Sequence, residues 1–228
     1  MRIINNYTFA STFGALLLSC LTVGHAGAVS ITQTGTLGAD NQVHEYLLNL
    51  PTAQTVDFYT TSYAGGKNLD GTTSAAGGFV PVLTLFSSAT GQVIDCSATG
   101  STCSGIQMTP PIGTIKADPT TGFVNDAFLR ESLTAGSYVV DLTEFPNGAS
   151  GDLNTNPRFL FSSDPNATGN ACGVTGGMFL EADMSPCTQR NGAFTLNVGT
   201  VPEPATLWLA LPVLVLGVLG RKRLLARA

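Results

Sequence analysis

The stretch Phe79–Cys96, "FVPVLTLFSSATGQVIDC", holds two short apolar runs on either side of a Ser/Gly turn around Gly91. Strands favour β-branched and aromatic residues, and a short connection that contains Gly is typical of a β-hairpin. The stretch therefore predicts two neighbouring antiparallel strands, and the same pattern can be followed outward along the chain.

Apolar residues alternate with polar ones in further short segments, which are separated by clusters of turn-forming residues. These segments are Val43–Leu50, Thr55–Tyr63, Gly136–Phe145, Arg158–Ser162, Met178–Ala182 and Ala193–Val198. A period of two residues is the signature of a strand with one buried face, and no amphipathic helix of convincing length interrupts the pattern. The sequence predicts an all-β protein built as an antiparallel β-sandwich or jelly roll.

The alternation also assigns side chains to the two faces of a strand. In the segment "GSYVVDLTEF" it places Tyr138, Val140 and Leu142 inward and Asp141 and Thr143 outward.

The N-terminus has the three parts of a secretory signal peptide. Arg2 is a weak positive start, Phe13–Val23 is an apolar run, and "AGA" at Ala26 to Ala28 is a small-residue cleavage site. We predict a signal helix that is removed by cleavage after Ala28. An alternative is a lipoprotein acylated at Cys20.

The C-terminus predicts a single transmembrane helix. Ala205–Gly220 is sixteen residues without a charge, which makes roughly 24 Å of helix against a hydrocarbon core of about 30 Å. Trp208 lies near one end, and Arg221, Lys222 and Arg223 follow the other, where basic clusters stay cytoplasmic. The alternative is a buried core helix. The chain is thus divided into a signal peptide at 1–28, a β-sandwich domain at 29–200 and a sorting segment at 201–228.

Pro202, Glu203 and Pro204 precede this helix, so that motif, short helix and basic tail follow one another. This order resembles the PEP-CTERM sorting signal of Gram-negative bacteria. The resemblance covers about the last 28 residues. It implies that an exosortase, a membrane-embedded cysteine protease, recognises the three residues and releases the protein to the cell surface or extracellular matrix, often beside exopolysaccharide. Proline fixes φ and keeps such a segment extended, as a protease requires.

Without the two ends, residues 29–204 carry fifteen acidic and five basic residues, a net charge of −10. The bases are Lys67, Lys116, Arg130, Arg158 and Arg190. A folded nucleic-acid-binding domain normally has a basic patch, which five dispersed bases do not form. Nucleic acid is therefore not an expected partner.

Four cysteines remain after processing, an even number that predicts disulfides in an exported protein. The most local pairing is Cys96–Cys103 and Cys172–Cys187. A four-cysteine zinc site is the rival, but it usually needs closely spaced pairs, and the sequence has no C-x-x-C.

Two stretches, within Thr61–Ile94 and Asn125–Asn147, resemble a family of exported PEP-CTERM proteins of unknown function and, more distantly, the jelly-roll domain found after secreted bacterial peptidases. They share the strand "PVLTLF", a Gly turn and a later "LTAGSY". The resemblance implies an accessory module for adhesion or binding. The peptidase-associated domain usually has an Asp before "PVLTLF" and acidic residues after the second strand. Val80 and the Cys96 loop stand there instead, which weakens the case for calcium.

Candidate groups for catalysis and metal binding are few. His44, the only histidine between 29 and 228, alternates with apolar residues on an inward face and is interpreted as structural. Asp152, Asn154 and Asn156 have the spacing of a calcium loop but lack its Gly and its final Glu, which favours a solvated turn. Asn166 matches a glycosylation acceptor and is interpreted as ordinary loop.

The sequence therefore predicts a non-enzymatic surface or matrix protein without a cofactor or metal, associated with exopolysaccharide or the envelope. Its predicted partners are an exosortase and, transiently, the inner membrane. Two alternatives stay open. One is a secreted hydrolase that uses two carboxylates, and the other is a calcium-stabilised adhesion module.

Overall fold

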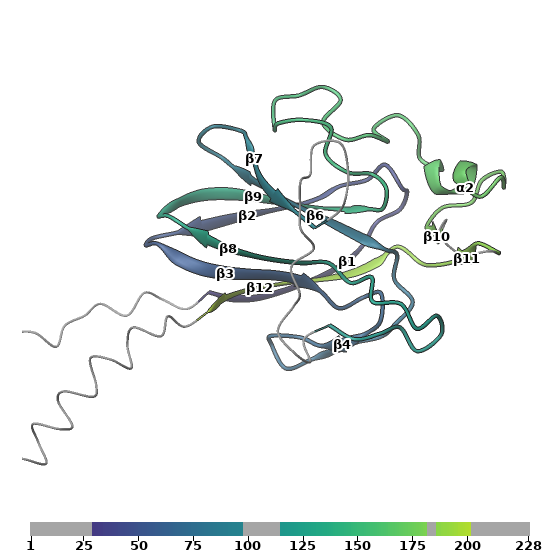
Figure 1. Cartoon of the computed structure of the whole chain (residues 1–228), viewed down its shortest axis with the longest axis horizontal. Helices are drawn as coiled ribbons and strands as arrows, with labels where there is room; N and C mark the ends of the chain where they lie inside the picture. Colours follow the sequence, from purple (N-terminus) through teal and green to yellow (C-terminus); the bar gives the residue numbers. More distant parts are fainter. Residues whose placement is uncertain (1–28, 98–114, 182–185, 202–228) are drawn as a thin grey trace, which may run out of the picture.

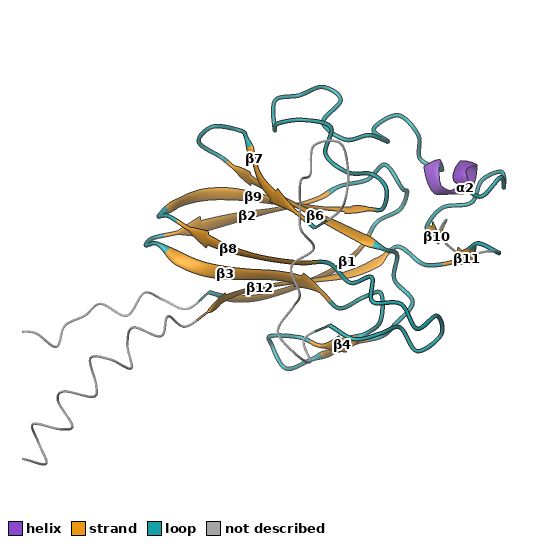
Figure 2. Ribbon diagram, in the orientation of Figure 1, coloured by secondary structure: helices purple, strands orange, loops and turns teal. Residues whose placement is uncertain are grey.

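The computed structural model describes residues 29–97, 115–181 and 186–201, and in this part of the chain strands form two four-stranded antiparallel sheets. Figure 1 shows the sheets as two layers, and Figure 2 shows how little helix accompanies them. The first sheet has the order β1 (Ser30–Thr36), β12 (Ala193–Val201), β3 (Gln54–Thr60), β8 (Phe128–Leu133). The second has the order β2 (His44–Leu50), β9 (Gly136–Glu144), β6 (Pro81–Ser87), β7 (Val93–Cys96).

Smaller elements lie in the connections. β4 (Gly66–Lys67) pairs with β5 (Thr73–Ser74), and β10 (Leu180–Glu181) pairs with β11 (Thr188–Gln189). A single helical turn, α2 (Ala167–Ala171), lies beside β10 and β11 at one end of the sheets.

The large strands pair as a nested set. The predicted hairpin β6–β7 is the innermost pair, followed by β3 with β8, β2 with β9, and β1 with β12. The first and last strands of the domain are thus neighbours, with Ser30 opposite Gly199. The described chain begins and ends at the same end of the sheets, away from α2 (Figure 1).

One hydrophobic core fills the space between the two sheets. Alternate side chains from both sheets meet there, which places the two sheets face to face. The most deeply buried members are Val56, Phe58, Leu83, Leu85, Leu129, Val140, Leu142 and Leu196, all at 0% exposure. Burying an apolar side chain of this size contributes about 1.5–3 kcal/mol, so this interface supplies the main stabilisation of the domain.

The outer face of the second sheet is also covered. Phe86 and Val139 on that face pack against Ala149 and Phe159, which belong to the segment that follows β9. Asp141 and Thr143 face away from the core, as the alternation predicts, but both side chains are fully buried beneath this segment.

The same covering segment contains an incorrect prediction. Arg158–Ser162 does not form a strand, because its residues lie in turns apart from one isolated bridge between Phe159 and Ala149. Its apolar side chains pack one by one onto the sheet below. Met178–Ala182 likewise contributes only the two residues of β10.

The predicted all-β, antiparallel character is confirmed. Two strands of the large sheets were not anticipated from the sequence, because β1 has hardly any apolar alternation and β8 directs a glutamate inward. Within the described ranges, no helix is both long and apolar enough to cross a bilayer. The predicted signal peptide and the segment from Pro202 onward lie outside the described residues.

Two neighbouring leucines test the register of β2. Leu48 is 2% exposed and belongs to the core, whereas Leu47 is 62% exposed on the opposite face. Leu48→Ala is expected to lower the free energy of unfolding by about 2–5 kcal/mol. Leu47→Ala is expected to change it by less than about 0.5 kcal/mol. Urea denaturation of both variants measures the difference, and equal effects would contradict the assigned faces.

Candidate functional site

A cluster of buried charged groups lies at the end of the sandwich that carries β10 and β11. Arg190, 8% exposed, directs Nη1 to Asp118 Oδ2 at 3.0 Å and Nη2 to Glu181 Oε2 at 2.9 Å. Its guanidinium stacks on the ring of Tyr63 at 4.2 Å from the centroid, and the hydroxyl of Tyr63 donates to Glu181. These four residues are called the Arg190 cluster.

The Arg190 cluster joins segments that are far apart in the sequence. Asp118 also accepts hydrogen bonds from the backbone N–H groups of Thr120 and Thr121. Burial opposes the effect, but the hydrogen bonds from Thr121 and Arg190 hold the pKa of Asp118 below its usual value. Removing one partner of a buried ion pair leaves the other charge buried without a partner, which destabilises the fold. The cluster therefore acts as a structural link between these segments.

Asp40 forms a second link at the same end. Its carboxylate accepts hydrogen bonds from the N–H and hydroxyl of Thr168 and, at 2.8 Å, from the N–H of Phe179. The connection between β1 and β2 is thereby held against α2 and β10. Asn147 adds to this contact by donating to the backbone oxygen of Asp40 at 3.1 Å.

Glu144 is a further buried acid at this end, and one of its carboxyl oxygens has no hydrogen-bond partner among the described residues. The residue is 2% exposed, and the oxygen in question is Oε2. The carboxyl lines a cavity of about 10 Å³ shared with Phe179, Glu181 and Arg190, about the volume one water molecule needs. Burial, with a further contribution from Asp40, raises the pKa of Glu144 to about 10. Glu144 is therefore neutral at physiological pH.

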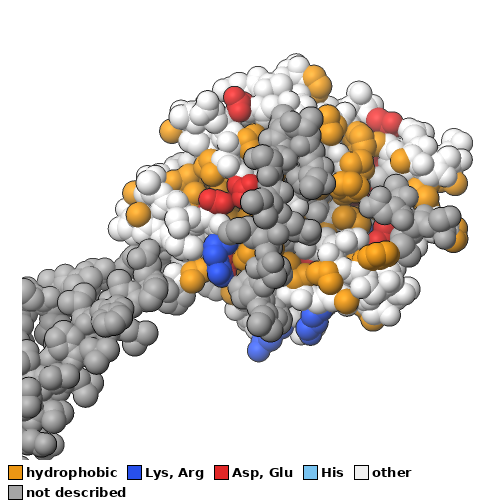
Figure 3. Space-filling view, in the orientation of Figure 1, with side chains coloured by type: hydrophobic (Ala, Val, Ile, Leu, Met, Phe, Trp, Pro, Cys, Tyr) orange, Lys and Arg blue, Asp and Glu red, His pale blue; other side chains and the backbone are white. Residues whose placement is uncertain are grey.

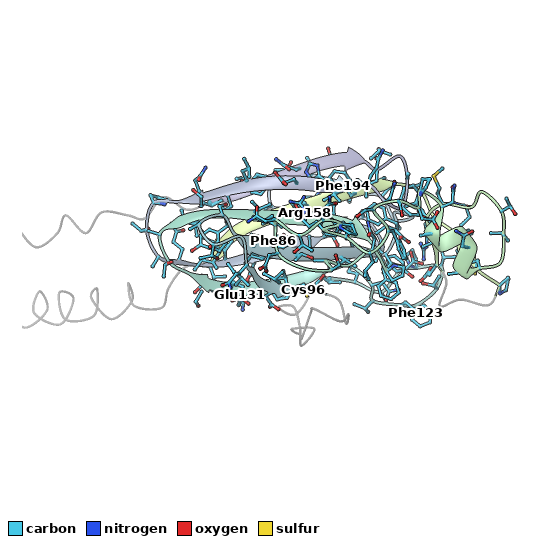
Figure 4. The ribbon with its side chains drawn as sticks, turned by 90° about the horizontal axis from the view of Figure 1, so that it is seen from above. Phe86, Cys96, Phe123, Glu131, Arg158 and Phe194 are labelled. Atoms are coloured by element: carbon cyan, nitrogen blue, oxygen red, sulfur yellow. A yellow bond between two sulfur atoms is a disulfide. The ribbon has the colours of Figure 1, made fainter. Side chains whose placement is uncertain are left out.

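A pair of carboxylates lies between the edge strands of the two sheets. Glu131 is opposite Val56 in β3, and Asp95 is opposite Leu85 in β6, so both acids belong to inward-facing rows. Burial and the contact with Asp95 raise the pKa of Glu131 to about 7. Figure 4 shows Glu131 and Cys96 toward one edge of the sandwich and Phe194 toward the other. Inward-facing charges on edge strands prevent pairing with other chains.

A third acidic position lies under the segment that covers the second sheet. Arg158 approaches Asp141 at 3.1 Å and Glu45 at 3.2 Å, and its guanidinium also lies over the rings of Phe86 and Phe159. Burial raises the pKa of Asp141 to about 7, although Arg158 acts in the opposite direction. The arginine therefore serves as the link that fastens the covering segment.

The predicted disulfide Cys172–Cys187 is confirmed. It closes a loop with a sequence separation of 15, which contributes about 3 kcal/mol in the loop-entropy estimate. An open depression of about 560 Å³ adjoins it, lined by the glycine-rich loop Val174–Gly177 together with Leu180 and Gln189. Cys96 is disulfide-bonded, but Cys103 lies outside the described residues, and the pairing Cys96–Cys103 stays a prediction.

His44 has the structural role expected from the sequence. Its Nε2 lies 2.8 Å from Gln33 Oε1, and its ring packs on Phe194 with centroids 4.5 Å apart. Burial lowers the pKa of His44, which favours the neutral ring. The contact joins the edge strands β1 and β2, so His44 closes one side of the sandwich.

The other singled-out residues lie in loops. Asp152, Asn154 and Asn156 occupy an exposed turn, and Asp152 Oδ1 accepts a hydrogen bond from Val93 N at 3.4 Å. No group of three or more His, Cys, Asp or Glu side chains in the described ranges is placed to hold a metal ion. Asn166 is the N-cap residue of α2. Ala26, Ala28, the Pro202-Glu203-Pro204 motif and the basic tail lie outside the described residues.

Sequence reasoning missed the Arg190 cluster, whose Tyr63 and Asp118 are distant in the sequence from Glu181 and Arg190, and the pair Asp95–Glu131, which is 36 residues apart. A signal for Glu144 was present, because it continues the inward alternation of Tyr138, Val140 and Leu142. Neither family models nor curated proteins match this chain.

Three carboxyls with raised pKa values predict a stability that falls as the pH rises. The folded protein holds the protons of Glu131, Asp141 and Glu144 more tightly than the unfolded chain does. Their contribution to the free energy of unfolding is therefore complete below about pH 4. It is lost as the pH rises through about 7 for Glu131 and Asp141 and through about 10 for Glu144.

Glu144→Gln tests the largest of these shifts. Glutamine has the shape of the protonated acid but does not ionise in this pH range. The variant is therefore expected to be about 1–3 kcal/mol more stable than the wild type near pH 8. Near pH 4 the two proteins should be similar. Denaturant unfolding at both pH values measures the change, with Asp152→Asn as the control at an exposed carboxylate. A variant that is equally destabilised at both pH values would show that Glu144 is not held neutral.

Proposed function

We propose that this chain is an exported, non-enzymatic module of the cell surface or extracellular matrix. In this proposal the signal peptide is removed after Ala28, and Ala205–Gly220 anchors the precursor in the inner membrane of a Gram-negative bacterium. An exosortase then releases the domain at Pro202-Glu203-Pro204. The order of motif, apolar segment and basic tail in the sequence carries this part of the proposal.

The end of the last strand is compatible with such a release. β12 ends at Val201, which directly precedes Pro202 of the motif. This terminus of the strand lies on the side of the sandwich opposite to α2, β10 and β11. Cleavage after Val201 would therefore leave every described strand and link in place. In the anchored precursor, the end that carries the Arg190 cluster and the disulfide would point away from the membrane.

The nested strand pairing supports the jelly-roll part of the proposal. Eight strands that pair first with last, in sheets ordered β1-β12-β3-β8 and β2-β9-β6-β7, have the connectivity of a jelly roll. Jelly rolls occur in lectin and capsid domains as well as in enzymes, so the fold admits a binding module and does not name its ligand.

The non-enzymatic part rests on the partners of the charged groups. Each arginine of the domain forms an ion pair with a carboxylate: Arg130 with Asp57, Arg158 with Asp141, and Arg190 with Asp118 and Glu181. In the face drawn in Figure 3, Lys and Arg side chains are scattered rather than gathered into a groove. A glycan would therefore meet polar loop groups, without a basic groove that attracts an anionic polymer.

The pair Asp95–Glu131 favours one competing function, a carboxylate-based hydrolase. Two carboxyls that share a proton can divide the roles of acid and base. Retaining glycosidases, however, hold their two carboxyls about 5–5.5 Å apart to admit the sugar between them. Here the two side chains contact each other directly. This contact leaves no room for a sugar between them and favours a structural role at the edge of the sheets.

Processing is tested by the intact mass of the protein purified from its native host. The mature form is expected to begin at Val29 and to lack the tail "RKRLLARA", because cleavage at the motif removes the helix. In a host without the exosortase, the full C-terminus and membrane association should persist. A mature surface form that keeps the tail in the native host would reject the processing step.

Binding is tested with a glycan array and a pull-down of host exopolysaccharide, beside a broad hydrolase assay. We expect retention of polysaccharide without turnover, because each arginine of the domain is already paired and Asp95 contacts Glu131 directly. Glu131→Gln is the matched variant and should not alter either result. Turnover that this variant abolishes, with an unchanged melting temperature, would establish the hydrolase instead.

A further inference from the structure

Strand β1 presents an unpaired edge. It is the terminal strand of the first sheet, and its only strand partner is β12 among residues 29–97, 115–181 and 186–201. Thr200 N donates to Val29 O at 2.9 Å, and Leu37 N donates to Gly192 O at 2.8 Å. Bonded and non-bonded pairs alternate in an antiparallel ladder, so the odd-numbered residues of β1 bond to β12. The even-numbered residues, Ser30 to Thr36, direct their N–H and C=O groups away from the sheet.

The other three sheet edges are obstructed. β7 is four residues long and follows a register shift between Leu85 and Phe86. β8 contains Arg130 and Glu131, and β2 contains Glu45. Short strands, irregular register and charges are the features that prevent edge pairing. β1 has seven residues, "SITQTGT", with no charge and no proline.

The β1 sequence is complementary to itself in one antiparallel register. If Gln33 lies opposite Gln33 of a second copy, Ser30 is opposite Thr36 and Thr32 is opposite Thr34. These are even-numbered residues, whose backbone groups are the ones that point outward. Cross-strand pairs of hydroxyl residues are favourable. On the other face Ile31 is opposite Gly35, where the ring of Phe194 from β12 lies against the glycine.

We propose that β1 is a homodimerisation edge, at which two copies pair antiparallel about Gln33 and join their first sheets into one continuous eight-stranded sheet. The occupant is a second copy because this register matches the outward donors and acceptors of the strand with its own and places its hydroxyl residues opposite one another. The proposal is independent of the ligand and the processing proposed above. The dimer is weak, since one strand pair buries far less surface than the roughly 1,200–2,000 Å² of a stable complex.

Charge outside the strand opposes the association. The domain carries a net charge of −10 between residues 29 and 204, and the N–H of Asp70 contacts Thr32 Oγ1 at 3.3 Å beside this edge. Salt screens such repulsion. The dissociation constant of the dimer is therefore expected to fall as the ionic strength rises. A dimer held together by opposite charges would show the reverse, because salt would weaken it.

Sedimentation equilibrium of the purified protein from micromolar to millimolar concentration tests the proposal. Thr34→Pro removes an outward N–H without breaking a bond to β12, and Thr34→Lys places like charges near each other across the interface. Each is expected to raise the dissociation constant at least tenfold. Asn49→Lys, on the neighbouring edge β2, is the matched control and should leave it unchanged. Melting temperatures confirm that all variants are folded.

Amide hydrogen exchange gives a second readout. The amides of Thr32 and Thr34 should exchange more slowly at high protein concentration than at low, and Thr34→Lys should abolish this difference at Thr32. A protein that stays monomeric throughout would overturn the proposal. A dimer that survives both Thr34 variants, or that Asn49→Lys disrupts instead, would also overturn it. So would capture of a peptide from another protein at β1 while the purified protein remains monomeric.

Discussion

The two sheets of this domain depend on one shared core, and seven of their eight strands contribute apolar side chains to it. Phe58, Leu85, Leu129 and Leu196 come from four strands of the two sheets and are fully buried together. This constraint determines the register of each strand, because a shift by one residue would exchange the inner and outer faces. It also explains the nested pairing, since a chain that folds its first strand against its last can close both sheets over a common interior.

A core of this kind ends at the margins of the sheets, and polar groups have to be accommodated there. At one side Gln33 meets His44, a neutral pair that connects β1 with β2. At the other side Glu131 meets Asp95, and burial raises the pKa of Glu131 to about 7. At the α2 end Glu144 continues an inward row beyond its last apolar residue and is held neutral. At each of these three places the side chains face inward but lie beyond the last apolar residues of the core.

The long connections fold back on the sheets by means of individual polar contacts. Asp40, Arg158 and Arg190 each fasten one connection, and each acts through hydrogen bonds or ion pairs with residues distant in the sequence. The disulfide Cys172–Cys187 restrains the same end of the molecule as Asp40 and Arg190. This end is therefore held by individual polar contacts and the disulfide, whereas the opposite end has short turns, such as those between β2 and β3 and between β8 and β9, beside the first and last described residues.

The sequence by itself determined the class of structure and most of the strands. β2, β3, β9 and β12 could be predicted because each alternates apolar and polar residues. β6 and β7 could be predicted because they are two short apolar runs joined by a Ser/Gly turn, and Cys172–Cys187 because a local pairing is the simplest. The alternation within a strand does not indicate which other segments of the chain cover the outer face of its sheet. Only the tertiary structure decided that Asp141 and Thr143 are buried under a returning segment, that "RFLFS" is not a strand, and that β1 belongs to a sheet. The Arg190 cluster was likewise beyond prediction, because the fold alone brings Tyr63 and Asp118 to Glu181 and Arg190, and this proximity leaves no periodic trace in the sequence.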